Sequence, residues 1–345
     1  MNAADPNFLA AQSIARGLLG GGATPTLDRV GGGRNSRIYR VVSGGRTFAL
    51  KQYFPRQGNL KRRLNAEVSA LRLMEQHAID TVPRVLAVDA EHGCMLLSWI
   101  DGTPVTSTSE RDMDLAVAFL CSIHAMRSLP EAAALPAAGE ACLCGGEIER
   151  QIRLRLARLY ECASGEPSLD EFLDESFAPA LETRLDYSRA QLSRAGVSFA
   201  DPLEPEWRSL IPADFGFHNC LRRPDGTLGF VDFEYFGWDD PVKLTADVLL
   251  HPGMTLTPAM RLHLRRGAER CYGSDPTFAD RLEALQPLFG LRWVLILLNE
   301  FLPERWEQRV NAGASKSWDE AKASQLAKAR SFLARLGQLD KGAAE

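Results

Sequence analysis

The fold is decided by one short stretch of the chain and the strand after it, which read Ile211-Pro212-Ala213-Asp214-Phe215-Gly216-Phe217-His218-Asn219 and Phe230-Val231-Asp232-Phe233-Glu234. Asp214 and Asn219 lie on one loop. The turn Pro224-Asp225-Gly226 then reverses the chain, so that Asp232 ends a strand returning beside that loop. The pattern therefore predicts that two carboxylates and one amide oxygen lie close together.

These side-chain types are the ones that phosphoryl transfer requires. One carboxylate orients the attacking hydroxyl and accepts its proton, while a second carboxylate and an amide oxygen supply hard ligands to Mg²⁺. The alternative is an Asp/Asn turn that only caps a loop. The hairpin that brings Asp232 into register favours the chemical interpretation.

Outward from this stretch, the chain divides into a strand-rich part and a longer helical part. Residues 1–25 resemble a weak helix that ends in glycines, and Ser43-Gly44-Gly45 predicts a hairpin turn. Strands are expected at 37–42, 47–53, 85–88 and 94–97, and helices at 60–77, 110–127, 147–162, 168–195, 258–272, 278–302 and 317–336. The order predicts an α+β fold in which a small sheet precedes a large helical region.

Composition excludes several classes of protein. The formal net charge of -4 and a pI near 6.0 argue against nucleic-acid binding, which needs a basic surface. The N-terminus lacks the pattern of a signal peptide, and the apolar run 293–298 is too short to span a membrane. The seven cysteines lack the paired spacing of a zinc site. We therefore expect a cytoplasmic protein with reduced thiols and no membrane partner, and the oligomeric state stays open.

The strand-rich part contains a glycine-rich segment and a lysine, which are residue types that can contact phosphate groups. Glycines let backbone N–H groups approach phosphate oxygens closely, and a lysine at the end of the following hairpin can contact the α- and β-phosphates of a nucleotide. The residues in question are Gly31, Gly32, Gly33, Asn35, Ser36 and Lys51.

Glu67 is a carboxylate within the apolar stripe of the helix predicted at 60–77. A charge in that place requires a partner, and Lys51 is the natural one. In the alternative interpretation, Glu67 lies at the edge of the stripe and reaches water.

These motifs together resemble the aminoglycoside phosphotransferase and choline kinase-like family, which has a protein-kinase-like fold. The family carries an Asp, then an Asn five residues later, then an Asp at a strand end, as Asp214, Asn219 and Asp232 do here. The resemblance spans about residues 27–300. One departure is that the family has His-Gly before the first Asp, where this chain has Pro212-Ala213.

The resemblance implies a bilobal protein with a site between an antiparallel sheet and a helical lobe. It implies an N-terminal segment at 1–26, a nucleotide-binding lobe at 27–101, and a catalytic and acceptor-binding lobe at 102–345. It implies ATP and Mg²⁺ as cofactors, and a Lys51–Glu67 pair that holds the phosphate-binding lysine. By the same resemblance the catalytic base is Asp214, the metal ligands are Asn219 and Asp232, and the hinge that contacts the base is Ser98, Trp99 and Ile100.

The residues after Asp232 are dense in acids and aromatics, which suits a cationic or sugar-like acceptor. The candidate substrate residues are Glu234, Tyr235, Trp238 and Asp240. The alternative is that Asp240 is the N-cap of a helix beginning near Pro241, and that the aromatic residues belong to the core.

The resulting hypothesis is an enzyme that transfers phosphate from ATP to a hydroxyl of a small molecule, such as an amino alcohol, a sugar or an aminoglycoside-like compound. The loss of His-Gly motivates an alternative from another class, a pseudokinase-like regulatory module that keeps the nucleotide site with weak catalysis. The retention of Lys51, Glu67, Asp214, Asn219 and Asp232 favours the enzyme.

Overall fold

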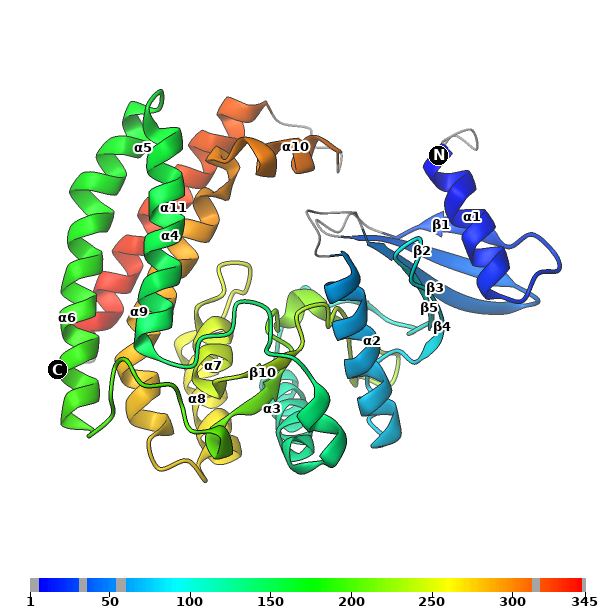
Figure 1. Cartoon of the computed structure of the whole chain (residues 1–345), viewed down its shortest axis with the longest axis horizontal. Coiled ribbons are helices and arrows are strands. Elements are labelled where there is room, and N and C mark those ends of the chain that lie inside the picture. Colours follow the sequence, from blue (N-terminus) through cyan, green and yellow to red (C-terminus); the bar gives the residue numbers. More distant parts are fainter. Residues whose placement is uncertain (1–5, 31–35, 54–59, 312–316, 343–345) are drawn as a thin grey trace. The chain divides into compact units, whose positions relative to one another are not determined.

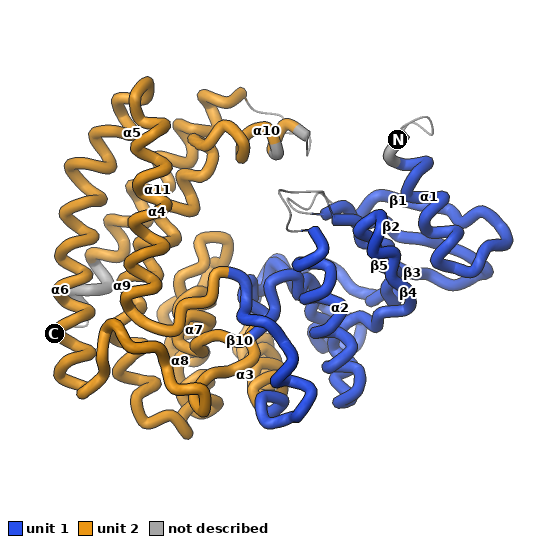
Figure 2. Tube along the Cα trace, in the orientation of Figure 1, with its two compact units in different colours: residues 1–108, 125–139, 212–237 blue, residues 109–124, 140–211, 238–345 orange. Residues whose placement is uncertain are grey.

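The computed structural model of the chain describes residues 6–30, 36–53, 60–311 and 317–342. These form two compact units, shown in different colours in Figure 2. The first unit contains residues 1–108, 125–139 and 212–237, and the second contains 109–124, 140–211 and 238–345. The functional division into 1–26, 27–101 and 102–345 stays a prediction, and the first compact unit joins residues 125–139 and 212–237 to the N-terminal residues.

The first unit is built on a five-stranded antiparallel sheet with the strand order β1-β2-β3-β5-β4 (Figure 1). The predicted hairpin is confirmed, and Gly44 and Gly45 make its turn with φ of 56° and 73°, which glycine adopts without steric cost. The strand β1 was not predicted, since it has only four residues. The strands are β1 (Thr26–Arg29), β2 (Ser36–Ser43), β3 (Arg46–Tyr53), β4 (Val85–Asp89) and β5 (Cys94–Ser98).

The two faces of this sheet contact different helices. Side chains alternate along β3, so that Phe48 and Leu50 join an apolar cluster with Ala11 and Ala15 of α1 (Pro6–Leu18). Lys51 lies on the opposite face, toward α2 (Leu60–Gln76). The alternation of β3 therefore separates an apolar face from the face that carries charge.

A second, three-stranded sheet lies between Asn219 and Asp232 in the sequence and includes one earlier strand. Its order is β6-β8-β9, with β6 at Thr103–Pro104, β8 at Cys220–Arg222 and β9 at Leu228–Phe230. The predicted turn is confirmed, and the Arg223 N–H donates to the Thr227 carbonyl at 2.9 Å across it. The Phe230 N–H donates to the Thr81 carbonyl at 2.8 Å, which ties this sheet to the loop after α2.

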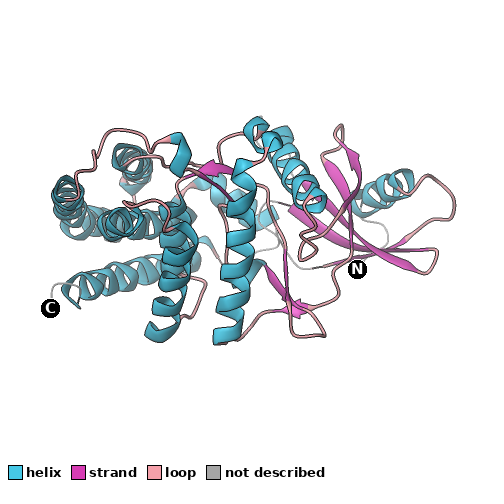
Figure 3. Ribbon diagram, turned by 90° about the horizontal axis from the view of Figure 1, so that it is seen from below, coloured by secondary structure: helices cyan, strands magenta, loops and turns pink. Residues whose placement is uncertain are grey.

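The second unit is mainly helical, as the ribbon coloured by secondary structure shows (Figure 3). The segment predicted as one helix at 168–195 is helical throughout, but a π-helical turn interrupts it. The sequence did not signal the helix α10. The elements of this part are α3 (Glu110–Ala125), α4 (Gly145–Ala163), α5 (Pro167–Glu171), the π turn Phe172–Phe177, α6 (Ala178–Arg194), β7 (Ser209–Ile211), β10 (Gly237–Asp239), α7 (Pro241–Leu250), α8 (Pro258–Tyr272), α9 (Phe278–Leu297), α10 (Pro303–Asn311) and α11 (Trp318–Gly342).

Short 3₁₀ turns connect several of these elements. They lie at Met126–Ser128, Pro130–Ala134, Pro205–Trp207, Phe217–Asn219 and Leu298–Phe301. The turn at Phe217–Asn219 belongs to the loop of Asp214, so Asn219 ends this turn directly before β8 begins at Cys220.

The helix α9 is the core of the second unit and packs against α4, α6, α7 and α11. Together with the turn after it, Phe278–Phe301 is long and apolar enough to cross a membrane, yet 61% of its most apolar stretch is buried. Arg292 of this helix is also buried, 2.7 Å from the Asp247 carboxylate. These are the features of a core helix, as the sequence predicted.

Candidate functional site

Lys51 is the centre of a buried cluster of charges in the first unit. Its side chain is 4% exposed, and its Nζ lies 2.5 Å from Glu67 Oε2 and 2.7 Å from Asp232 Oδ1. The predicted Lys51–Glu67 pair is therefore confirmed. The same ammonium also contacts Asp232, which is expected to bind the metal. The Lys51 ammonium on β3 therefore contacts both a residue of α2 and a residue of the segment after β9.

Glu67 has no route to water. Its side chain is 1% exposed on the apolar face of α2, which rules out the alternative in which it reaches solvent. Besides Lys51, it accepts hydrogen bonds from the Tyr53 hydroxyl and from the Phe233 N–H, the latter at 3.3 Å. A buried carboxylate that is satisfied on both oxygens is held in one position.

The charge state of Lys51 follows from two opposing effects. Burial lowers the pKa of an ammonium, but the carboxylates of Asp232 and Glu67 more than offset this and raise the pKa of Lys51 well above its usual value. Burial and the charge of Glu67 also raise the pKa of Tyr53. Lys51 therefore stays cationic and Tyr53 stays a neutral donor across the physiological range.

Asp214 lies on the loop after β7 with a more open side chain, which is 43% exposed. His218 Nε2 lies 3.3 Å from its Oδ1. Ala213 has a φ of 63°, in the left-handed region that favours glycine. At the position where the family that the sequence resembles has glycine, this chain carries an alanine in a backbone conformation that favours glycine.

Asn219 is tied to the same loop and to the strand before Asp232. Its Nδ2 donates to the Asp214 carbonyl at 2.9 Å, and its own carbonyl accepts from the Val231 N–H at 3.0 Å. With the amide nitrogen engaged, Oδ1 is the ligand atom available to a metal. Asp214, Asn219 and Asp232 thus belong to one hydrogen-bonded segment.

Asp232 also has a left-handed backbone, with a φ of 72°. Aspartate tolerates this region better than most residues, although it still costs on the order of 1 kcal/mol. Its side chain is 35% exposed, and one carboxylate oxygen contacts Lys51. Asp232 therefore faces the buried ammonium on one side and solvent on the other. Non-glycine residues with such backbone angles concentrate at functional sites.

The expected hinge follows β5. The Ser98 N–H donates to the Arg84 carbonyl at 2.9 Å, and its hydroxyl accepts from the Arg84 N–H. The Ser98 N–H is therefore already engaged, and the contact of this hinge with a base stays a prediction. Ile100 packs so closely on Gly229 of β9 that a Cβ there would lie 2.9 Å from it.

A groove of about 710 Å³ also borders this hinge. Its lining includes Glu75, Asp80, Trp99 and Asp225, and among the described residues it does not include Lys51 or the residues paired with it. The groove is therefore separate from the cluster of charges.

The glycine-rich segment is only partly described. Gly31, Gly32, Gly33 and Asn35 lie outside the described residues. Ser36 begins β2, is 6% exposed, and pairs with Tyr53 across the hairpin. This register places the end of the glycine-rich segment beside the strand that carries Lys51.

The candidate substrate residues have different surroundings. Glu234 is 3% exposed, and its Oε1 lies 3.6 Å from Arg63 Nη1. Tyr235 is half-buried, and burial raises its pKa. The backbone carbonyl of Tyr235 accepts from the Gly139 N–H at 2.8 Å. The structure thus places Glu234 in the interior, facing a cation of α2.

Trp238 and Asp240 belong to the second unit. Asp240 accepts from the Val242 N–H at 2.8 Å as the N-cap of α7, pairs with Arg281, and is 2% exposed. The capping alternative is therefore confirmed for Asp240, whose carboxylate is engaged inside the protein.

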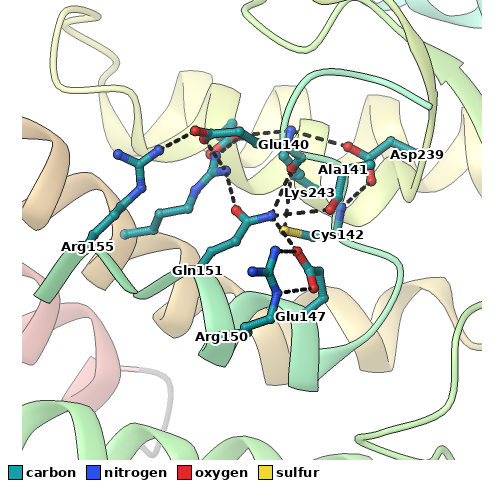
Figure 4. A network of polar contacts seen from close by, with 11 residues as sticks. Glu140, Ala141, Cys142, Glu147, Arg150, Gln151, Arg155, Asp239 and Lys243 are labelled. Carbon is teal, nitrogen blue, oxygen red and sulfur yellow. Dashed lines mark hydrogen bonds and ion pairs between the residues drawn. The ribbon is translucent and has the colours of Figure 1, made fainter. Parts of the chain in front are cut away.

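The second unit also has a buried network of charges at the start of α7 (Figure 4). Lys243 Nζ lies 3.3 Å from Asp239 and 3.7 Å from Asp247, and the Cys142 N–H donates to Asp239 at 2.7 Å. Gln151 donates to the Ala141 carbonyl at 3.2 Å. These bonds fasten the loop before α4 to α7.

Two residues of the cluster around Lys51 were missed by the sequence analysis. Tyr53 lies two positions after Lys51 on the same face of β3, and Arg63 lies one helical turn before Glu67 on α2. The signal was present for Arg63, because it is a second charge within the apolar face of that helix.

Comparison with known proteins places this arrangement in a family. A model of the phosphotransferase enzyme family matches residues 26–280. No match was found among curated proteins.

Three solved structures illustrate the fold. The choline kinase LicA from Streptococcus pneumoniae is 15% identical, with a TM-score of 0.58 over 96% of this chain and 100% of that chain. An aminoglycoside phosphotransferase from Alicyclobacillus acidocaldarius subsp. acidocaldarius DSM 446 is 15% identical, with a TM-score of 0.55 over 91% and 92%. A thermostable mutant of the aminoglycoside phosphotransferase APH(4)-Ia, in ternary complex with ADP and hygromycin B, is 15% identical, with a TM-score of 0.52 over 94% and 98%. The match of the family model over residues 26–280, together with this protein-kinase-like fold, shows that the chain belongs to the phosphotransferase enzyme family.

Proposed function

We propose that the protein transfers the γ-phosphoryl group of ATP to a hydroxyl group of a small molecule, in a reaction that requires Mg²⁺. The observation that carries this proposal is the contact of the Lys51 ammonium with both Glu67 and Asp232. A buried cation held by one interior carboxylate and one partly exposed carboxylate suits the binding of nucleotide phosphates beside a metal.

The residues of the segment 214–232 fit a magnesium ion. Mg²⁺ prefers oxygen ligands, and Asp232 and Asn219 offer a carboxylate and an amide oxygen. Asp232 is partly exposed, and the amide nitrogen of Asn219 is engaged by the Asp214 carbonyl, so that oxygen remains as the ligand atom. When bound, the metal neutralises charge on the phosphates.

Asp214 takes the role of general base in this proposal. Its carboxylate is the most open of the group, which allows an acceptor hydroxyl to approach it. The interaction with His218 at 3.3 Å and the bond between Asn219 and the Asp214 carbonyl fix the loop. Asp214 would orient the hydroxyl and take up its proton as the oxygen attacks.

The acceptor is proposed as a class. An amino alcohol, a sugar or an aminoglycoside-like compound agrees with the neighbours in fold, one of which is a choline kinase and one a complex with hygromycin B. All seven cysteines are free thiols, which supports the proposal of a cytoplasmic location.

The test is a magnesium-dependent assay of ATP turnover over a panel of amino alcohols, sugars and aminoglycosides, with phosphorylated products detected by mass spectrometry. We expect at least one product, lost in Asp214→Asn and retained in the control Asp186→Asn, which changes an exposed aspartate of α6. Nucleotide binding without any product, and with Asp214→Asn identical to the wild type, would favour the regulatory module instead.

A further inference from the structure

Arg63 and Glu234 form a second buried ion pair beside that of Lys51 and Glu67. Arg63 is 5% exposed and Glu234 is 3% exposed, and Nη1 lies 3.6 Å from Oε1. The proposed transfer reaction uses neither side chain. A pair of interior charges is costly to desolvate, so its presence here requires an explanation.

The helix α2 contributes one residue to each of the two ion pairs. Arg63 and Glu67 are one turn apart on α2 and so share a face of that helix. Glu234 comes two residues after Asp232. The helix therefore contacts the segment 232–234 at successive points, through Glu67 to the Phe233 N–H and through Arg63 to Glu234.

Tyr53 fills the space between the two pairs. Lys51 Nζ lies 5.1 Å from the centroid of its ring, and Arg63 Cζ lies 5.6 Å from the same centroid. Its hydroxyl donates to Glu67. The ring therefore contacts both cations, and its hydroxyl ties it to the carboxylate that pairs with Lys51.

We propose that Arg63 and Glu234 are positioning residues, which clamp the segment 232–234 against α2 and so hold Asp232 at Lys51. This inference rests on the proposed function for its catalytic meaning, but the clamp itself is a property of the free protein. Asp232 needs such support because its left-handed backbone is unfavourable unless its neighbours fix it.

The charges of the cluster agree with this role. Glu67, Asp232 and Glu234 are three carboxylates beside two cations, Lys51 and Arg63. Removing Arg63 would remove the cation that faces Glu234 from α2. The segment 232–234 would then keep only the Glu67 contact with that helix, and Asp232 would be held less firmly.

A direct role for Glu234, as a ligand of the metal or of the acceptor, makes a different prediction. A ligand acts through its own atoms, so only its own substitution matters. A clamp acts through the pair, so substituting either partner has the same effect and substituting both adds little.

The experiment compares Arg63→Met, Glu234→Gln and the double variant with the wild type. Arg62→Met is the matched control, because Arg62 is the exposed neighbour of Arg63 on α2. Arg63→Lys keeps a cation of another shape and tests whether the charge alone holds the segment 232–234 in place. The first measurement is hydrogen–deuterium exchange of the peptide covering 230–236 in the free protein, which depends on neither nucleotide nor turnover.

We expect exchange of this peptide to rise in both single variants, to rise no further in the double variant, and to stay at the wild-type level in Arg62→Met. The second measurement is the Mg²⁺ concentration that half-saturates turnover, which should rise on the order of tenfold in each single variant, with the KM for the acceptor unchanged. Faster exchange in a protein that lacks turnover would support the clamp while contradicting the proposed function. The clamp would be overturned if exchange of this peptide were unchanged in Arg63→Met. It would also be overturned if the rise in the Mg²⁺ requirement were confined to Glu234→Gln.

Discussion

Lys51 and Asp232 are 181 positions apart in the sequence, and Nζ of the one lies 2.7 Å from Oδ1 of the other. The lysine is buried and the aspartate is partly exposed. The contact therefore joins an interior network, which includes Glu67 and Tyr53, to a carboxylate that solvent and ligands can reach.

Substitution of Lys51 by methionine should abolish most activity and also weaken the fold. It removes the cation proposed to bind phosphates, and it leaves Glu67 buried without its ammonium partner. We expect kcat/KM for ATP to fall by about 100-fold or more and the free energy of unfolding to fall by about 3–5 kcal/mol. Steady-state kinetics and urea denaturation measure the two effects. The control is Lys61→Met, an exposed lysine on α2, and a fully active Lys51→Met protein would contradict the assignment.

Asp214→Asn should affect the chemical step and leave the fold intact. The side chain is 43% exposed, so the amide replaces the carboxylate with little change in packing. Loss of a general base lowers kcat by about 100- to 10,000-fold, while the KM for ATP stays near that of the wild type. Kinetics and thermal denaturation check this prediction. Equal losses in nucleotide affinity and in stability would show that Asp214 acts in folding instead.

Two substitutions at Asp232 separate its charge from its backbone. Asparagine tolerates the left-handed φ of 72°, so Asp232→Asn removes the charge alone, whereas Asp232→Ala adds strain of about 1 kcal/mol. Both variants should need a higher Mg²⁺ concentration for turnover. The alanine variant should also have a lower free energy of unfolding than the asparagine variant, because of the added strain. Magnesium titrations and urea denaturation distinguish them. An unchanged magnesium requirement in both would remove Asp232 from the metal site.

Ala213→Gly should stabilise the protein. Ala213 has a φ of 63°, where a Cβ is unfavourable by about 1–2 kcal/mol, and glycine removes that strain at a smaller cost in the entropy of the unfolded chain. The expected gain is about 0.5–1 kcal/mol in the free energy of unfolding, measured by urea denaturation. Destabilisation would mean that the loop does not hold this backbone in solution.

The buried Asp240 should give the protein a specific dependence on pH. Burial raises the pKa of Asp240 to about 6, although Arg281 and the Val242 N–H oppose the shift. Its folded pKa thus lies above the unfolded value of about 4, so the folded state binds more protons between these values. The contribution of Asp240 to stability is complete below about pH 4 and is lost as the pH rises through about 6.

Comparison of the wild type with Asp240→Asn isolates this effect. The difference between their unfolding free energies should shrink by about 3 kcal/mol between pH 4 and pH 7. Urea denaturation at closely spaced pH values measures it. A difference that is constant or grows with pH would contradict the raised pKa.

The parts of the site that depend on local patterns could be predicted from the sequence. Glu67 was recognised because a charge within an apolar helical stripe needs a partner, and the hairpin around Gly44 and Gly45 has strong turn chemistry. The turn Pro224-Asp225-Gly226 predicted that Asn219 and Asp232 would be neighbours. In each case the signal lies within a few residues of the feature.

The remaining features depend on contacts between distant segments. The substrate role of Glu234 stays a prediction from its acidic and aromatic neighbours. Its contact with Arg63 joins two distant segments, so no local pattern contains it. The left-handed backbones of Ala213 and Asp232 have no signal in their side chains. Such angles are imposed by the surrounding structure, which a pattern of residue types does not contain.

Calorimetric titration of ADP into the protein, with and without Mg²⁺, tests most directly whether the contact of Lys51 with Asp232 is a nucleotide site. The account predicts binding that Mg²⁺ strengthens in the wild type and that weakens about tenfold or more in both Lys51→Met and Asp232→Asn. Binding of equal strength in all three proteins, or no binding to the wild type, would contradict it.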